Sequence, residues 1–233
     1  MKRVVTPELL DSDAGTPTEV ADSLADLRGI NRKFGGIATT QAMIEHVWRW
    51  GSPRLAGQVP SPHDQLSLLE VGSGSGDVAL AARERLAPKG LRLDVTLLDR
   101  AASHLTTGNS HRAIVGNALA LPFAGESFDL VSCGLFAHHL SPEELLQFMN
   151  EALRICRIAL LINDLVRSPI HLALVYAAYP LYRSRLTRHD APASVRAAYT
   201  PEEMRNLIAQ TSAAKVEIVR RRLYRMGVMI WKK

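Results

Sequence analysis

Hydrophobic and polar positions along this chain alternate in segments that predict strands and helices in turn. Short apolar runs bounded by turn-forming residues predict strands at 66–71, 92–98, 112–115, 128–133 and 157–164. Helical spacing of apolar residues predicts helices at 77–87, near 100–107, at 142–154 and from 201 to about 211. Two final strands, near 215–222 and 225–232, have no helix between them. This alternation predicts an α/β fold with a mostly parallel sheet.

The residues before the first strand predict a helical cap. Thr16-Pro17-Thr18-Glu19 has the pattern of a capping box and starts a helix that runs up to Gly35-Gly36, with a second helix at about 39–50. The predicted organisation is a loose arm over 1–15, an arm and cap together spanning 1–60, a Gly/Pro-rich linker at 51–65 and a main domain over 61–233.

The segment Leu68–Gly76 joins a buried-strand pattern to a helix through three alternating glycines. Glycine lets main-chain N–H groups approach a ligand, because no Cβ stands in the way. Asp99 ends the next predicted strand about 20 residues further on, where a carboxylate that binds ribose hydroxyls is expected. The predicted cofactor site contains Glu70, Gly72, Ser73, Gly74, Gly76, Asp99 and Arg100. Since Gly74–Ala79 also fits G-x-G-x-x-A, the loop alone does not distinguish NAD from another nucleotide cofactor.

From Glu70 onward the loop has the pattern E-x-G-x-G-x-G, which resembles the first motif of class I S-adenosylmethionine-dependent methyltransferases. The segment Gly116–Asp129 is similar to G-D-A-x-x-L-P-F-x-x-x-S-F-D of the ubiquinone/menaquinone-biosynthesis (type 11/12) enzymes, with Asn117 in place of the usual Asp. The resemblance implies S-adenosyl-L-methionine as cofactor, with further contacts from Asn117, Ala118, Cys133 and His138. It also implies a Rossmann-like, seven-stranded, mostly parallel sheet with an antiparallel last strand and helices on both faces.

Residues 30–36 and 163–200 look like small bacterial methyltransferases that accompany type III polyketide synthases. The connection over about 165–200 is too long for a plain loop, and we expect it to build an acceptor pocket. The resemblance implies O-methylation of a phenolic or pyrone polyketide, an aromatic small molecule with or without an alkyl tail. The residues expected to bind this acceptor are Phe34, Asn163, Asp164, Tyr176, Arg188 and Arg196.

A phenol has a pKa near 10, so its methylation at neutral pH needs a general base, and histidine is best matched to that task. His139 and His189 are the predicted catalytic residues, His138 is a further candidate, and Asp164 and Asp190 are the possible orienting carboxylates. Arg188, Asp190 and Arg196 are expected to form a charge network around His189. Alternatively, Arg185, Arg188 and Arg196 neutralise an acidic acceptor, and the product is an ester. The alternative is structural: His139 lies in a loop before a capped helix, and His189 lies in an arginine-rich surface loop.

Three other functions stay open at this level. A C-methyltransferase of a quinone precursor needs the same cofactor site. An NAD-dependent oxidoreductase rests on the shifted glycine pattern alone. A non-catalytic protein that retains the cofactor fold is the third, because fold does not imply function.

Composition adds few constraints. The 233 residues are 47% hydrophobic and carry a net charge of +5, with basic runs at 183–188 and 220–222 that lack the aromatic interleaving of a nucleic-acid site. Only Cys133 and Cys156 are present, with no metal-ligand spacing, so we expect no metal site and a cytoplasmic location. The apolar stretch Leu172–Tyr182 is too short to span a bilayer and is expected to be a buried or a substrate-facing helix, with a core position favoured. We expect a monomer or homodimer without stable membrane insertion.

Overall fold

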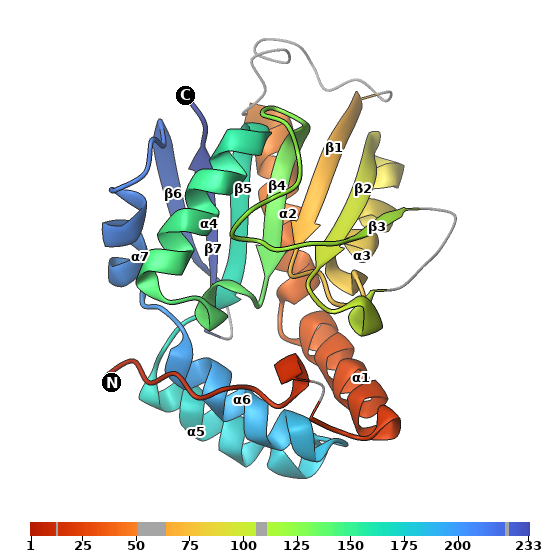
Figure 1. The fold of residues 1–233 in the computed structure, drawn as a ribbon, viewed down its shortest axis with the longest axis vertical. Helices are drawn as coiled ribbons and strands as arrows, with labels where there is room; N and C mark the ends of the chain where they lie inside the picture. Colours follow the sequence, from red (N-terminus) through yellow and green to blue (C-terminus); the bar gives the residue numbers. More distant parts are fainter. Residues whose placement is uncertain (13, 51–63, 106–110, 222–223) are drawn as a thin grey trace.

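The computed structural model describes residues 1–12, 14–50, 64–105, 111–221 and 224–233. Its centre is a seven-stranded sheet in the order β3-β2-β1-β4-β5-β7-β6 (Figure 1). The strands are β1 (Asp64–Val71), β2 (Leu91–Asp99), β3 (Arg112–Val115), β4 (Phe128–Gly134), β5 (Cys156–Leu165), β6 (Lys215–Arg221) and β7 (Arg225–Trp231). Every neighbouring pair is parallel except those of β7, which runs antiparallel to β5 and β6. The predicted fold class is confirmed.

Helices cover both faces of this sheet. The helices are α1 (Pro17–Lys33), α2 (Gly36–Trp50), α3 (Asp77–Leu86), α4 (Pro142–Ile155), α5 (Pro169–Ala177), α6 (Arg185–Ala197) and α7 (Pro201–Ile208). Helices α2 and α3 pack on one face and α4 and α7 on the other, which gives two hydrophobic cores. Successive side chains of a strand point to opposite faces, so Leu68 of β1 lies in one core and Leu69 in the other.

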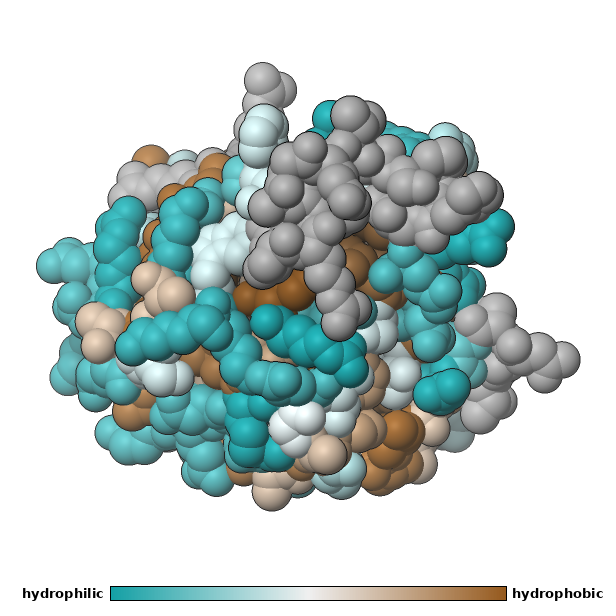
Figure 2. Space-filling view, turned by 90° about the horizontal axis from the view of Figure 1, so that it is seen from above, coloured by the Kyte–Doolittle hydropathy of each residue, from teal (hydrophilic) through white to brown (hydrophobic). Residues whose placement is uncertain are grey.

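A cap of α1, α5 and α6 lies beyond the carboxyl ends of the parallel strands (Figure 1). The N-terminal arm runs along this cap, and the expectation that it is loose is wrong. Arg3 donates hydrogen bonds to the carbonyl oxygens of Ala197 (2.7 Å), His138 (3.0 Å) and Leu140 (2.8 Å). The arm is therefore fixed between the cap and the sheet edge. Figure 2 shows the opposite end of the molecule, where hydrophilic side chains alternate with smaller hydrophobic areas.

The junction of α1 and α2 is fixed to the sheet by a buried arginine. Gly35 has a φ of +81°, and a Cβ on Gly36 would lie 2.3 Å from Oδ1 of Asn31. That same oxygen accepts a hydrogen bond from Nη2 of Arg225 at 2.9 Å, and Arg225 is 1% exposed. Arg225 also donates to the carbonyl oxygen of Phe34. The turn between the two helices is thereby tied to the first residue of β7.

The capping boxes at Thr16, Ser141 and Thr200 are present, with α1, α4 and α7 starting where these patterns predict. Between Leu172 and Tyr182 the expectation of a buried core helix is wrong, whereas the substrate-facing alternative stays a prediction. Helix α5 ends at Ala177, and the side chains of Ile170, Leu174, Tyr176 and Leu181 are exposed. An amphipathic pattern is absent there, so the local pattern does not indicate which face of α5 packs on α6.

Other expectations fall partly outside the described residues. Most of the predicted linker at 51–65 and the predicted domain boundary at 60/61 are outside the described residues. Arg222 of the basic run is outside them as well. Of the helix expected near 100–107, the structure describes a short 3-10 helix at Ala102–His104. No helix in the described ranges has the length and apolar character needed to cross a membrane.

Candidate functional site

The glycine loop after β1 has a backbone that glycine alone adopts readily. Gly72, Gly74 and Gly76 have φ angles of +62°, +51° and +75°. A Cβ on Gly72 would lie 2.4 Å from the ring of Phe136, and one on Gly76 would lie 2.4 Å from the Leu97 side chain. A Cβ on Gly74 would meet no atom within 4 Å. The outer glycines thus allow close packing, whereas Gly74 borders open space.

Asp99 lies against this loop. Its Oδ2 accepts a hydrogen bond from the backbone N–H of Gly74 at 2.8 Å, and its Oδ1 accepts one from the N–H of Ala101 at 3.0 Å. Because β1 and β2 are parallel neighbours, their carboxyl ends bring the glycine loop and this carboxylate to the same edge of the sheet. The next residue, Arg100, is exposed, and its Nη2 lies 3.5 Å from the carbonyl oxygen of Asp11.

Two of the predicted cofactor residues lie behind the loop, within the sheet. Glu70 is 3% exposed, and its Oε2 accepts a hydrogen bond from the Ser132 hydroxyl. Burial raises the pKa of Glu70 to about 7, against the lowering effect of that hydrogen bond. Cys133 is 2% exposed, and burial, with the charges of Asp164 and Glu70, raises the pKa of its thiol. Both side chains are thus buried among neighbouring strands of the sheet.

Asn117 and Ala118 follow β3 at the same edge of the sheet. The N–H of Gly116 donates to the carbonyl oxygen of Asp99 at 2.9 Å, which holds this segment beside β2. Asn117 is exposed, and its Oδ1 accepts a hydrogen bond from the N–H of Leu119 at 2.9 Å in a local turn. The structure thus brings Asn117 to the neighbourhood of Asp99 and the loop.

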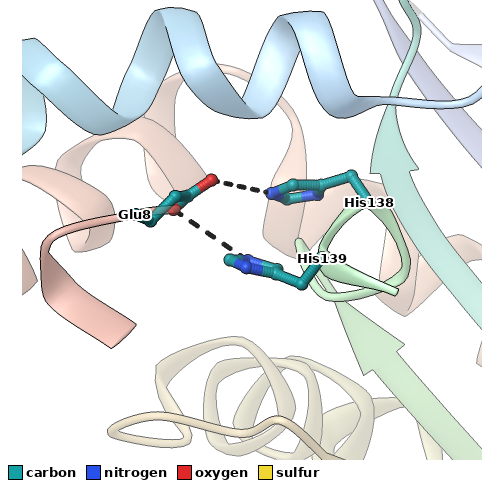
Figure 3. Close-up of side chains that lie close together, drawn as sticks. All are labelled: Glu8, His138 and His139. Carbon is teal, nitrogen blue, oxygen red and sulfur yellow. Dashed lines mark ion pairs between the residues drawn. The ribbon is translucent and has the colours of Figure 1, made fainter. Parts of the chain in front are cut away.

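A second polar group lies where β4 and β5 end. His138 and His139 belong to the short 3-10 helix Ala137–His139, and Glu8 comes from the N-terminal arm (Figure 3). Oε1 of Glu8 lies 3.4 Å from Nε2 of His138, and its Oε2 lies 4.0 Å from Nε2 of His139. We call Glu8, His138 and His139 the arm–histidine cluster.

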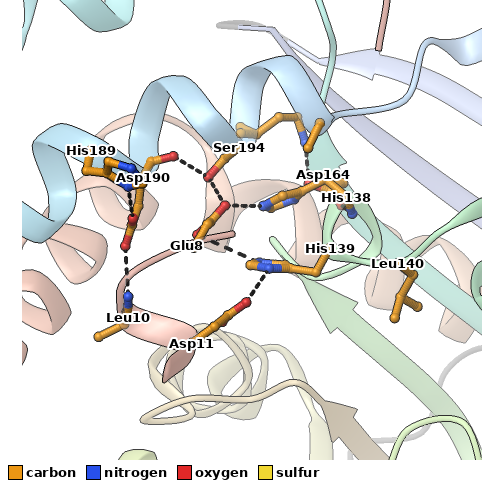
Figure 4. Close-up of polar contacts among 12 residues, drawn as sticks. Glu8, Leu10, Asp11, His138, His139, Leu140, Asp164, His189, Asp190 and Ser194 are labelled. Carbon is orange, nitrogen blue, oxygen red and sulfur yellow. Dashed lines mark hydrogen bonds and ion pairs between the residues drawn. The ribbon is translucent and has the colours of Figure 1, made fainter. Parts of the chain in front are cut away.

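Each imidazole ring faces Glu8 with its Nε2 and is held by a second carboxylate at its Nδ1 (Figure 4). Nδ1 of His138 donates to Asp164 at 2.7 Å, and Nδ1 of His139 donates to Asp11 at 2.8 Å. Burial alone would lower the pKa of His138, but Asp164 and Glu8 raise it to about 10. Burial would raise the pKa values of Asp164, Glu8 and Asp11, but the two histidines hold all three below their usual range. These charges stabilise one another inside the protein.

One aromatic ring separates the arm–histidine cluster from the glycine loop. The ring of Phe136 occupies the space in front of Gly72 and stacks on His139, with ring centroids 6.4 Å apart. The two groups of polar residues therefore belong to the same edge of the sheet, on either side of Phe136.

His189 lies in helix α6 and not in a loop, which corrects the expected setting of this residue. Its Nδ1 donates to the carboxylate of Asp190 at 2.8 Å, and its side chain is 42% exposed. Asp190 also accepts hydrogen bonds from the N–H groups of Leu9 and Leu10, so it holds the arm (Figure 4). His189 and the arm–histidine cluster are thus connected through residues 8–10.

The residues expected to bind an acceptor are dispersed. The predicted network of Arg188, Asp190 and Arg196 is not formed, because Arg188 donates to the Tyr182 carbonyl and Arg196 donates to the Tyr176 hydroxyl. Phe34 is 42% exposed at the end of α1.

Asn163 is buried, and its amide donates to the carbonyl oxygen of Gly36 and the Thr40 hydroxyl. These bonds hold α2 against β5, so Asn163 has a structural role here in place of the expected acceptor contact.

Glu8 and Asp11 were missed by the sequence interpretation, because nothing in the local pattern of the arm marks them as partners of histidines about 130 residues away. The adjacent pair His138-His139 was the available sign. Arg3 was missed for the same reason, since its three acceptors are backbone oxygens.

Comparison with known proteins agrees with the geometry at this edge of the sheet. Residues 68–158, from β1 into β5, match the family model described as "Methyltransferase domain". A search of curated proteins gave no match.

Several solved methyltransferases have a similar structure. The plantazolicin methyltransferase BpumL, in complex with a monoazolic desmethylPZN analog and SAH, is 13% identical with a TM-score of 0.64, over 97% of this chain and 95% of that chain. The plantazolicin methyltransferase BamL, with a triazolic analog and SAH, is 15% identical with a TM-score of 0.63, over 91% of each chain. Magnesium protoporphyrin IX methyltransferase of Synechocystis PCC 6803, with bound SAH, is 14% identical with a TM-score of 0.52, over 84% of each chain.

Some solved relatives are longer, and the chain spans 59% and 49% of the length of two of them. Identities this low indicate a shared fold and leave the substrate open. The chain therefore carries the sequence pattern of a methyltransferase domain over residues 68–158, on a fold that it shares with solved methyltransferases.

Proposed function

We propose that this protein is an S-adenosyl-L-methionine-dependent methyltransferase that methylates the hydroxyl of a phenolic or pyrone polyketide. The observation that carries the proposal is the contact between Gly74 and Asp99 at the carboxyl edge of the sheet. There, left-handed glycines leave the backbone accessible beside a carboxylate that can accept ribose hydroxyls.

The cofactor site extends over three neighbouring strand ends. The loop from Glu70 to Gly76 would hold the amino-acid part of the cofactor, Asp99 its ribose, and Asn117 with Ala118 its adenine. The match of residues 68–158 to a methyltransferase domain supports this assignment. Three structural neighbours were crystallised with SAH, the product form of this cofactor.

The acceptor would lie between this edge and the cap of α1, α5 and α6. Phe34, Tyr176 and Arg196 belong to this cap, are exposed or half-exposed, and have the chemistry to contact an aromatic acceptor. Arg196 lies over the Tyr176 ring, 5.7 Å from its centroid, and donates to its hydroxyl at 2.7 Å. A structural neighbour is the CMeT domain of the citrinin polyketide synthase, with 14% identity and a TM-score of 0.53, which supports a polyketide-like acceptor.

The protein's part in the reaction is to align the acceptor oxygen and to receive its proton. The cofactor supplies a methyl carbon already activated by its sulfonium, so that positioning accounts for much of the rate enhancement. The acceptor oxygen bonds to that carbon while the carbon–sulfur bond breaks, and the hydroxyl proton goes to a base. His139 and His189 are the two candidates, each with a carboxylate at its Nδ1 and with Nε2 left to receive the proton.

The proposal is tested by calorimetry with S-adenosylmethionine and NAD, followed by turnover with labelled methyl donor on a panel of phenols and pyrones. We expect S-adenosylmethionine to bind and NAD not to bind. NMR of the product distinguishes a methylated oxygen from a methylated carbon. Binding of NAD alone would contradict the proposal, and binding of S-adenosylmethionine without turnover on any acceptor would indicate a non-catalytic protein.

The base is tested separately. We expect His139→Ala or His189→Ala to lower kcat about 100-fold or more at unchanged cofactor affinity. If both variants keep near-normal turnover, general-base catalysis by these histidines is wrong.

A further inference from the structure

The arm–histidine cluster has the composition and geometry of a metal site, although the sequence spacing predicts none. We propose that Glu8, His138 and His139 bind a divalent transition-metal ion of the zinc class. None of the three residues lies in the glycine loop, although the resemblance assigns His138 to the cofactor and His139 is one of the two candidate bases.

The distances suit a small ion. One oxygen or nitrogen atom from each residue lies within 4.8 Å of the others. Ligands about 2.1 Å from a tetrahedral zinc ion lie about 3.4 Å from one another. The pair Glu8 Oε1 and His138 Nε2 is already at 3.4 Å, and the pair Glu8 Oε2 and His139 Nε2 is at 4.0 Å (Figure 3). The two pairs use the two different oxygens of the Glu8 carboxylate.

All three candidate ligands are held by outer partners. Asp164 accepts from Nδ1 of His138, and Asp11 accepts from Nδ1 of His139, so each ring presents Nε2 toward Glu8. The Ser194 hydroxyl donates to Oε1 of Glu8 at 2.5 Å (Figure 4). A carboxylate at the far nitrogen is the usual second layer around metal-binding histidines, because it fixes the tautomer and the ring orientation.

Independent support comes from Nε2 of His138. The residue is 2% exposed, and within the described part of the chain this nitrogen is the buried side-chain atom that makes no hydrogen bond. Its contact with Oε1 of Glu8 at 3.4 Å is an ion pair only when the ring is doubly protonated, so with a neutral ring this buried nitrogen has no hydrogen-bond partner. Such atoms are costly and rare in native proteins. Nε2 points at Glu8 and toward the centre of the cluster, where an ion would satisfy it.

The charges of the cluster also favour a cation. With both imidazoles neutral, as metal ligands must be, the carboxylates of Glu8, Asp11 and Asp164 place three negative charges around them. A divalent ion offsets most of this charge. The competing arrangement is a second proton on His138. This proton and the ion would both bind Nε2, so only one of them can be present at a time.

The ligand types indicate which ions fit. Imidazole with one carboxylate suits zinc, iron, nickel and copper, and it disfavours magnesium and calcium, which take oxygen ligands. Three protein ligands leave a coordination position open. The side chains of Glu8 and His139 are 13% and 22% exposed, so water or an acceptor oxygen can reach that position. Nε2 of His139 cannot bind an ion and accept a proton together, so metal binding leaves His189 as the base.

The test is calorimetry of untagged, chelator-treated full-length protein with ZnCl2, repeated with CoCl2 while the visible absorption of bound Co2+ is recorded. We expect one equivalent to bind without added methyl donor. Glu8→Gln and His139→Gln should weaken binding more than about 100-fold, and Asp11→Asn about 10-fold to 100-fold. The matched control is His46→Gln, which removes another histidine paired with one carboxylate, 3.3 Å from Glu217, and should leave binding unchanged.

Near-UV circular dichroism of each variant establishes that it is folded. Glu8 and His139 are preferred to His138 as sites of substitution, because they are partly exposed whereas His138 is buried. Absence of stoichiometric binding overturns the proposal, as does equal binding by Glu8→Gln and wild type. Nitrogen NMR showing a doubly protonated His138 in the presence of excess zinc would overturn it as well. S-adenosylmethionine affinity, measured on the same samples, separates failure of this proposal from failure of the cofactor assignment.

Discussion

His138 and Asp164 form two hydrogen bonds with each other: the backbone N–H of His138 donates to Oδ2 of Asp164 at 2.9 Å, and its ring Nδ1 donates to Oδ1 at 2.7 Å. The two residues follow or end neighbouring parallel strands, β4 and β5, and both are almost fully buried. One imidazole orientation is thereby fixed by the sheet itself. The ligand that faces this ring, Glu8, comes instead from the arm.

The contact between Asp99 and the glycine loop predicts the effect of removing this carboxylate. Asp99→Ala should weaken S-adenosylmethionine binding at least about tenfold, because a charged hydrogen-bond partner contributes about 1.5–3 kcal/mol. Asp94→Ala, at an exposed position on the same strand, is the control and should bind normally. Calorimetry measures both, and equal affinities would remove Asp99 from the cofactor site.

The buried carboxyl of Glu70 predicts a stability that falls as pH rises. Burial raises its pKa from 4.5 to about 7, so the folded state holds a proton that the unfolded state releases between these values. This linkage lowers the free energy of unfolding by at most about 3 kcal/mol between pH 4.5 and 7. Urea unfolding of cofactor-free protein at pH 5 and pH 7.5 should show the fall, and Glu70→Gln should reduce it. Exposed Glu84→Gln should behave as wild type.

The link between Asn31 and Arg225 predicts a structural cost at the α1–α2 turn. Asn31→Ala leaves the buried guanidinium of Arg225 without one acceptor and should lower the free energy of unfolding by about 1–3 kcal/mol. Asn206→Ala, at an exposed position on α7, should cause no comparable loss. If chemical denaturation gives the same stability for both variants, this contact does not stabilise the cap.

The contacts of Arg3 predict how fast the backbone amides of the N-terminal arm exchange with solvent. Arg3→Ala removes three hydrogen bonds and the contact with the Tyr199 ring, where the guanidinium carbon lies 4.3 Å from the centroid. The amides of Val4, Leu9 and Leu10 should then exchange with solvent about tenfold faster, because their hydrogen bonds depend on a docked arm. Lys2→Ala, next to it and exposed, is the control for hydrogen-exchange mass spectrometry. Unchanged exchange in Arg3→Ala would mean that the other contacts of the arm, such as those of Asp190 and Ser194, hold it without Arg3.

Much of the architecture could be predicted from local patterns. The strand from Leu66 to Val71, the glycines after it and the capping boxes at Ser141 and Thr200 are local features, whose physical causes lie within a few residues. Asp99 could be placed near the loop because parallel strands end at one edge. The exposure of α5 could not be predicted, since a uniformly apolar helix gives no sign of which face is covered.

The strand–loop–helix element around Glu70–Gly76 follows from the amino-acid order alone, because glycine spacing and backbone freedom are local properties. The contacts of Glu8 and Asp11 with His138 and His139 arise only when the chain is folded. They depend on Arg3 and Asp190 fixing the arm across the ends of β4 and β5, and such long-range contacts leave no periodic trace in the sequence.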